Sequence, residues 1–158
     1  MGGHVDEDER EGAAAVSAGH RMVPHTADVA LEAWAPAKFE CVAQAVHALV
    51  GSFAEPAEPG EEPRPRDSVS VALDDAADDD LLVSVLDEVI YQVEVHGRVP
   101  VDISFDSFGP SGSFAVRLGT VPIDEVRIVG AIPKAVSLHE LRFGHVAGAW
   151  RCHVTIDV

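Results

Sequence analysis

Residues 78–93 read DDDLLVSVLDEVIYQV, and this stretch decides the class of fold. Its apolar residues recur at steps of three and four, which places them on one face of a helix: Leu81, Leu82, Val85, Leu86, Val89, Ile90 and Val93. Three aspartates precede this face, where carboxylates can cap free amide groups and match the positive end of the helix dipole. Metal binding is the alternative interpretation of these aspartates. The stretch predicts an amphipathic helix that packs on one side.

A similar apolar pattern lies upstream and predicts a first helix. Its members again recur at helical spacing: Phe39, Val42, Ala43, Val46, Leu49, Val50 and Phe53. Gly51 and the proline-rich residues 56–65 end the pattern. Because that proline-rich stretch also carries several glutamates, it is expected to form a long exposed loop.

The rest of the chain has the pattern of strands separated by glycine and proline. The expected strands are residues 29–34, 68–73, 99–105, 113–118, 126–129, 131–143 and 150–158. Helices come early and strands late, which favours an α+β fold: an antiparallel or mixed sheet with two amphipathic helices packed on one face. At 158 residues the chain is long enough for one domain with a real core. A single domain is therefore expected.

The N-terminal stretch differs from this pattern. Residues 1–21 include an acidic run and an alanine run, with no clustering of β-branched or aromatic side chains that could pack. We therefore expect a flexible acidic tail over residues 1–21 and a folded domain over residues 22–158. Removing the residues before Met22 should leave folding intact.

The charge balance restricts the choice of partner. With 27 acidic and 11 basic residues, the formal net charge is -16, which repels nucleic-acid phosphates. Direct tight binding to nucleic acid is therefore not expected. Such a surface suits cations and positively charged protein partners, although an acidic surface can also serve solubility alone. Both interpretations stay open on charge.

Cysteine usage and hydropathy indicate the compartment. The chain has two cysteines, Cys41 in a helical pattern and Cys152 in a strand pattern, and their spacing is not that of a metal site. Buried, reduced thiols are the expectation for both. No apolar run is long enough to cross a membrane, and no export signal is visible. A cytoplasmic location is expected, without a membrane partner.

Two aspartates at opposite ends of the domain are the best candidates for chemistry. Residues 24–28 place His25 and Asp28 at the mouth of the first expected strand. Asp157 lies in the apolar terminal strand, where an unpaired carboxylate would be costly to bury. If the two strands are neighbours, Asp28, Asp157 and the oxygens of Val158 form an all-oxygen cage that suits calcium or magnesium. A salt bridge or a solvated strand end is the alternative.

Other chemistries find less support. No histidine pair has the spacing of a zinc site, no serine has a nucleophile-elbow setting, and no glycine-rich loop opens a helix. Neither cysteine has an evident base partner. The sequence thus shows no catalytic centre of its own, and we expect a protein that is not an enzyme.

Four segments resemble the archease family, in order and with its spacing. They are HTADV at residues 25–29 with LEAW at 31–34, DLLV at 80–83 with LDEVIY at 86–91, KAVSLH at 134–139, and IDV at 156–158. The agreement extends over nearly all of residues 22–158. The chain departs from the family pattern at Pro24, at Ser84-Val85 and at Pro133. Compared with the family, these departures imply fewer metal ligands and an altered partner-facing surface.

The resemblance implies a single α+β domain that binds a divalent metal, calcium in the usual description. It further implies a cofactor of the RtcB-type tRNA-splicing RNA ligase, which promotes guanylylation of the ligase's histidine and repeated turnover without being the ligase. Asp28, Asp157 and Val158 match the metal ligands, and His25, Lys134 and His139 are candidate contacts to a partner or nucleotide. The alternative from another class is a stand-alone acidic module for divalent cations or protein interaction, with no ligase partner.

Overall fold

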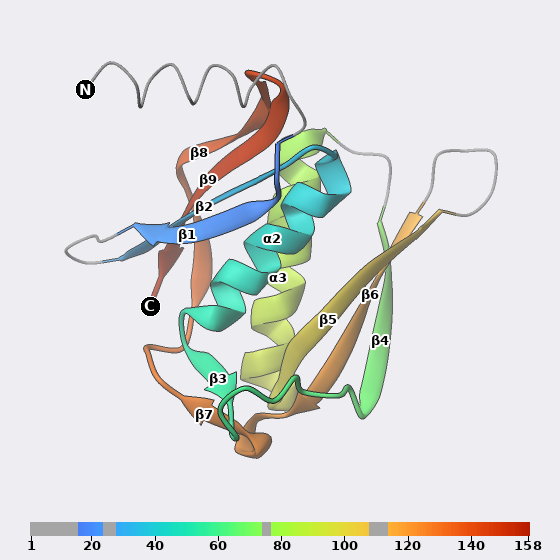
Figure 1. Ribbon diagram of the computed structural model, residues 1–158, viewed down its shortest axis with the longest axis vertical. Helices are drawn as coiled ribbons and strands as arrows, with labels where there is room; N and C mark the ends of the chain where they lie inside the picture. Colours follow the sequence, from blue (N-terminus) through green and yellow to red (C-terminus); the bar gives the residue numbers. More distant parts are fainter. Residues whose placement is uncertain (1–15, 24–27, 74–76, 108–113) are drawn as a thin grey trace.

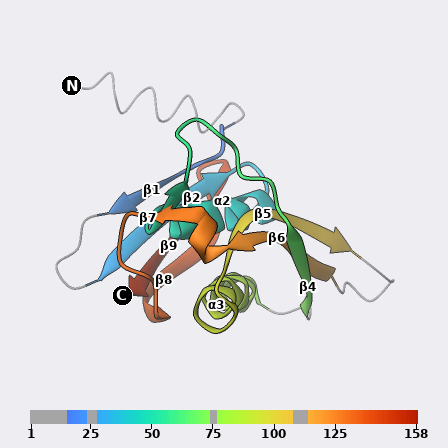
Figure 2. The same cartoon turned by 90° about the horizontal axis from the view of Figure 1, so that it is seen from below.

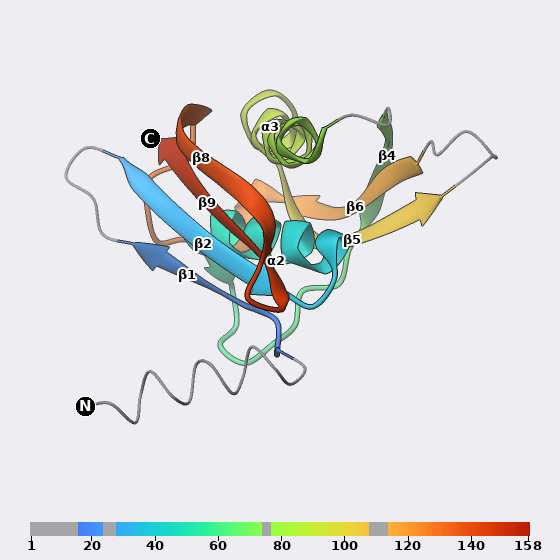
Figure 3. The ribbon, with the colours of Figure 1, turned by 90° about the horizontal axis from the view of Figure 1, so that it is seen from above.

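A computed structural model describes residues 16–23, 28–73, 77–107 and 114–158. Two helices lie side by side between a four-stranded and a three-stranded sheet (Figures 1, 2 and 3). All of the strand pairs are antiparallel. The predicted α+β class is confirmed. No helix in the described ranges has the length and apolar character needed to cross a membrane.

The two helices match the two predicted apolar patterns. Helix α2 spans Lys38–Gly51 and helix α3 spans Asp78–His96, which ends at Gly97 in the left-handed conformation with φ of 61°. The three aspartates form the first turn of α3, so their charge faces the positive end of the dipole. The N-cap is Ala77, without a side-chain cap. The aspartates therefore act through the dipole and not as the expected cap, and Asp78 also pairs with Lys38 at 3.0 Å.

The four-stranded sheet joins the two ends of the domain. Its order is β1-β2-β9-β8, so the last strand of the chain lies beside the second. The strand bounds are β1 Gly19–Val23, β2 Val29–Ala35, β8 Ala135–Val146 and β9 Ala149–Asp157. Strand β2, which follows Asp28, and strand β9, which ends at Asp157, are therefore neighbours in one sheet.

The remaining strands form two further sheets. The three-stranded sheet has the order β4-β6-β5, and β3 pairs with β7 in a two-stranded sheet. Their bounds are β3 Ala54–Pro56, β4 Asp67–Leu73, β5 Arg98–Ser107, β6 Phe114–Pro122 and β7 Val126–Ile128, with a 3-10 turn at Ile123–Glu125. The structure thus differs from the expected single sheet with both helices on one face. Helix α2 packs against β1, β2 and β9 of the four-stranded sheet and also against β5 of the three-stranded sheet, so the helices form a layer between the two sheets.

The core has two parts. The main cluster fills the space between the helices and the sheets, with fully buried members such as Leu31, Leu82 and Leu118. Both cysteines lie in this cluster as buried free thiols, as predicted. A smaller cluster lies at the C-terminal ends of the helices and contains Phe53, Ala54, Val93, Val99 and Val121.

Ordered structure begins earlier than the sequence predicted. Strand β1 pairs residue by residue with β2, although its first three residues fall in the expected tail of residues 1–21. A Cβ atom at Gly19 would lie 2.5 Å from the Trp34 ring, so only glycine lets this ring lie against the strand. The boundary at Met22 was wrong, because β1 includes Gly19, His20 and Arg21. Residues 1–15 lie outside the described residues.

Two truncations should distinguish a tail from the strand. Deleting residues 1–15 is expected to leave the melting temperature unchanged. Deleting residues 1–21 removes over half of β1 and the Arg21–Glu32 ion pair, and should cost about 1 kcal/mol or more, or about 2–4 °C in melting temperature per kcal/mol. Thermal melts followed by circular dichroism measure both. Equal melting temperatures for the two truncated proteins would contradict a structural role of β1.

A candidate metal centre at the end of the four-stranded sheet

The pairing of β2 with β9 brings the two predicted aspartates together. The ladder begins with Val29 opposite Ile156, and Asp28 and Asp157 are the next residues outward on each strand. Continuing the register by one position places Asp28 across from Asp157. Opposite residues of an antiparallel pair project to the same face, with Cβ atoms about 4.5–5.5 Å apart. The C-terminus accordingly lies beside the start of β2 (Figures 1 and 3).

Strand β8 adds a basic residue to the same end of the sheet. Ala135 pairs with Asp157, and the N–H of Lys134 donates a hydrogen bond to the carbonyl oxygen of Asp157 at 2.8 Å. The Lys134 residue is exposed to solvent. The structure therefore gathers Asp28, Asp157, the terminal Val158 and Lys134 from three neighbouring strands.

The carboxylates of this site are accessible and lack a basic partner among the described side chains. Asp157 is exposed, and Asp28 and Val158 are half-buried. No ion pair within residues 16–23, 28–73, 77–107 and 114–158 includes either aspartate. The predicted alternative of a salt bridge thus finds no partner there. The neighbouring carboxylates of Asp28 and Asp157 repel one another, and a bound cation would relieve this repulsion.

The donor set fits a hard divalent cation. All of the donors are carboxylate or carbonyl oxygens, which calcium and magnesium prefer, whereas zinc favours thiolate and imidazole ligands. Across the described residues there is no group of three or more histidine, cysteine, aspartate or glutamate side chains placed to hold a metal. With Asp28 and Asp157 as two side-chain ligands, an oxygen of Val158 and water would have to complete the six to eight positions of a calcium ion.

The two predicted histidine contacts do not join this group. His25 lies outside the described residues. His139 is exposed, in the part of β8 where pairing is irregular between Ser137 and Arg142. Its ring lies 3.7 Å from the carboxylate of Glu140, a residue with φ of 60°. The backbone N–H of His139 donates to the Ser137 hydroxyl at 3.2 Å. The structure gives His139 no contact with the paired aspartates.

A charged row across the same sheet was not foreseen from sequence. Arg21 of β1, Glu32 of β2, His153 of β9 and Arg142 of β8 occupy successive register positions. Arg21 Nε donates to Glu32 Oε1 at 2.6 Å, and His153 Nδ1 lies 3.3 Å from Glu32 Oε2. Partial burial opposes ionisation of Glu32, but the hydrogen bonds from Arg21 and His153 outweigh it and lower its pKa.

Replacing Glu32 with glutamine should show that the contribution of this carboxyl to stability depends on pH. A carboxyl whose pKa is lowered in the folded state stabilises the fold above its ordinary value of 4.5, and loses that contribution as pH falls through the lowered value. Because the groups are partly exposed, Glu32→Gln should cost at most about 1 kcal/mol at pH 7 and less at pH 3, which lies below the ordinary pKa of 4.5. Urea unfolding at both pH values measures the difference. A cost of the same size at both would refute this pH dependence.

Comparison with known proteins identifies the family. A family model for the Archease protein family matches residues 20–158. Two curated relatives from strains of Mycobacterium tuberculosis, each described as a probable protein archease, are 44% identical over 142 residues. The match covers 90% of this chain and 76% of each relative.

Solved structures show the same fold at low identity. A crystal structure of an archease from Thermotoga maritima, described as a possible chaperone, has a TM-score of 0.60 and 16% identity, covering 87% of this chain and 96% of that one. A solution structure of a Methanobacterium thermoautotrophicum protein has a TM-score of 0.62 and 18% identity, covering 89% and 99%. The matched family model and the relatives at 44% identity show that this chain belongs to the archease family.

Proposed function

We propose that this protein is a metal-binding activator of an RtcB-type RNA ligase in tRNA splicing or RNA repair. In this proposal it promotes guanylylation of the ligase's histidine and lets the ligase turn over repeatedly. Membership of the archease family supports the proposal, as does the description of the Thermotoga maritima relative as a possible chaperone. The role is that of a helper protein and not of a catalyst.

The single observation that carries the proposal is the register at the end of the four-stranded sheet. It brings two carboxylates, Val158 and a lysine to one edge of the sheet. A bound divalent cation would supply positive charge at this edge for a nucleotide or an acidic group of the partner. In this proposal Asp28 and Asp157 would hold the cation, and the exposed Lys134 would contact an anionic phosphate.

The charge of the whole chain agrees with a protein partner. At a formal net charge of -16 the molecule repels the RNA on which the ligase acts. Attraction to the basic surface of an RNA-binding enzyme is favoured by the same charge. In this proposal the protein contacts the ligase, and the ligase alone contacts the RNA.

Transfer of guanylate from GTP labelled at the α-phosphate to the histidine of a purified RtcB-type ligase, with release of pyrophosphate, tests the proposal. The ligase is incubated with RNA carrying ligatable ends, with and without this protein. With the protein present, covalent guanylate on the ligase should form faster, and ligated RNA should exceed one equivalent of ligase. A ligase whose guanylylation and turnover do not change at saturating protein would rule the proposal out.

A second candidate function is a stand-alone acidic module that binds divalent cations or other proteins. The excess of acidic residues and the two aspartates without a basic partner in the described part of the chain favour it. Copurification from the source cell separates the two candidates. The first requires an RNA ligase in the complex, whereas the second requires cation binding with no ligase present.

A further inference from the structure

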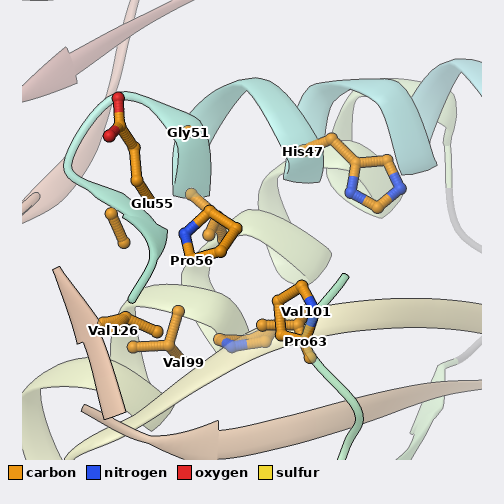
Figure 4. Close-up of a pocket in the computed structure, with 11 residues that line it drawn as sticks. His47, Gly51, Glu55, Pro56, Pro63, Val99, Val101 and Val126 are labelled. Atoms are coloured by element: carbon orange, nitrogen blue, oxygen red, sulfur yellow. The ribbon is translucent and has the colours of Figure 1, made fainter. Parts of the chain in front are cut away.

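An apolar pocket lies in the described structure away from the paired aspartates. It has a volume of about 170 Å3 and opens between the end of α2, strand β3, the loop that follows β3, and the start of β5 (Figure 4). Its walls are mostly aliphatic or proline side chains: Val50, Ala54, Pro56, Pro63, Val99, Pro100, Val101 and Val126. Two side chains that line it are ionisable, His47 and Glu55.

The pocket is preformed. Its wall residue Val99 is fully buried and belongs to the smaller core cluster, so the wall is fixed by core packing. Pro56, Pro63 and Pro100 lie in three separate segments around the space, and each proline holds its own backbone angle φ near one value. A ligand would therefore enter the pocket without a large ordering cost.

The size of the pocket decides the kind of occupant. Sites for whole small molecules usually enclose about 300–1,000 Å3. A space of about 170 Å3 is smaller than this, and matches one large apolar side chain. Single anchor side chains in such pockets contribute strongly to many protein interfaces.

The border of the pocket is acidic. Residues 57–62 connect Pro56 to Pro63, and within them Glu58, Glu61 and Glu62 are exposed. None of these three glutamates forms an ion pair with any residue that the structure describes. Arg64 and Arg98 are exposed basic residues next to the lining Pro63 and Val99, and Asp102 is an exposed acidic residue next to Val101. Acidic side chains without an ion pair in the described structure still outnumber basic ones beside the pocket, which favours basic segments over acidic ones.

The two ionisable lining residues add no positive charge to this border. The Glu55 carboxylate pairs with Arg127 and points away from Pro56 in Figure 4. Burial of part of its ring lowers the pKa of His47, and His20 lowers it further, while Asp102 partly offsets both effects. His47 is therefore neutral near pH 7.

A glycine at the border is consistent with an open mouth. Gly51 is the last residue of α2, lines the pocket, and would meet no atom within 4 Å if it carried a Cβ. Glycine in a helix costs roughly 0.5–1 kcal/mol relative to alanine. Neither close packing nor a left-handed backbone requires glycine at this position. A larger side chain can therefore be added at this lining position without a clash.

We propose that this pocket is a docking site for a protein segment that inserts one large apolar side chain flanked by lysine or arginine. The apolar wall takes the side chain, and the glutamates of residues 57–62 attract its basic neighbours. This interaction surface is separate from the paired aspartates, and it does not depend on the identity of the partner as a ligase.

Short peptides test the docking site directly. The protein labelled with 15N is titrated with Lys-Lys-X-Lys-Lys peptides in which X is leucine, phenylalanine or alanine, and with Glu-Glu-Leu-Glu-Glu. The leucine and phenylalanine peptides should shift the amide signals of Gly51, Val101 and Val126 saturably. The alanine and glutamate peptides should bind at least tenfold more weakly, and binding should weaken as salt rises. Equal shifts with all four peptides, or no shifts, would overturn the proposal.

Substitutions in the protein provide a second test of the docking site, with the same peptide titration. Gly51→Leu places a side chain in the mouth and should weaken binding of the leucine peptide at least tenfold without lowering the melting temperature. Gly144→Leu is the matched control, since Gly144 also faces open space but lies on β8, and should bind as the wild type does. The exposed pair Glu61→Lys with Glu62→Lys should weaken binding several-fold in a folded protein. Wild-type affinity in this charge variant or in folded Gly51→Leu would contradict the proposal.

Discussion

Replacing Asp28 with alanine is expected to abolish most of the activation of the RNA ligase while leaving the protein folded. Asp28 supplies one of two side-chain carboxylates at the proposed metal centre, and it is half-buried just before the start of β2 instead of packed in the core. Loss of a group that supports a metal site typically costs about 10–100-fold in metal affinity or activity. We expect at least that loss in guanylate transfer and in the number of turnovers.

The controls separate loss of the site from loss of the fold. Circular dichroism without added metal should give the wild-type spectrum for Asp28→Ala. Glu94→Ala removes an exposed carboxylate from α3, away from the sheet edge, and should activate the ligase as the wild type does. Lys134→Ala should cause a smaller loss, since a solvated lysine on the strand edge is the alternative role for this residue. Full activation by folded Asp28→Ala would leave the acidic-module function as the remaining candidate.

Replacing Ile156 with alanine is expected to cause a large loss of stability. Ile156 is 1% exposed in the main core, and it pairs with Val29 on one side and Val136 on the other. Truncating a buried isoleucine to alanine costs about 2–5 kcal/mol through lost burial and the cavity that remains. The neighbouring Asp157 is exposed, so Asp157→Ala should cost less than about 0.5 kcal/mol in the absence of metal.

Urea unfolding of the two variants measures this contrast between neighbouring residues. The midpoint for Ile156→Ala should fall sharply, and that for Asp157→Ala should stay close to the wild type. Similar losses for both variants would mean that the two faces of β9 are not divided into a core side and a site side.

Local patterns in the sequence predicted most of the individual elements. The apolar spacing of residues 78–93 identifies a helix because one face of α3 is buried against the rest of the core. Alternation over residues 29–34 identifies β2 for the same reason, since Leu31 and Ala33 are buried and Glu32 is not. These patterns can be read from the sequence because each reflects the burial of one face of a single helix or strand.

Contacts between distant elements could not be predicted in this way. Strand β1 was missed because polar His20 and Arg21 interrupt any apolar alternation, and the strand is defined by its pairing with β2. The division into three sheets was missed because alternation does not name a partner strand.

The candidate site shows the same limit. The sequence indicated that Asp28 and Asp157 carry suitable oxygen ligands, but only the register of β2 and β9 brings them together. The Glu32 row was not visible because its members are far apart in the chain, and Glu32 and His153 are separated by 121 residue numbers. Residue types in the sequence predict which ligands are available, whereas the pairing of strands decides which of these residues lie together in one site.

The most direct test of the metal centre is a calcium titration of the wild type and of Asp157→Ala, followed by melting temperature and calorimetry. Calcium at about 100 times its Kd stabilises a single-site protein by about 2.7 kcal/mol, which corresponds to a rise of about 5–10 °C at this chain length. The account predicts such a rise in the wild type with calcium or magnesium, no specific rise with zinc, and no rise in Asp157→Ala. An unchanged wild-type melting curve in millimolar calcium, or an equal rise in Asp157→Ala, would contradict it.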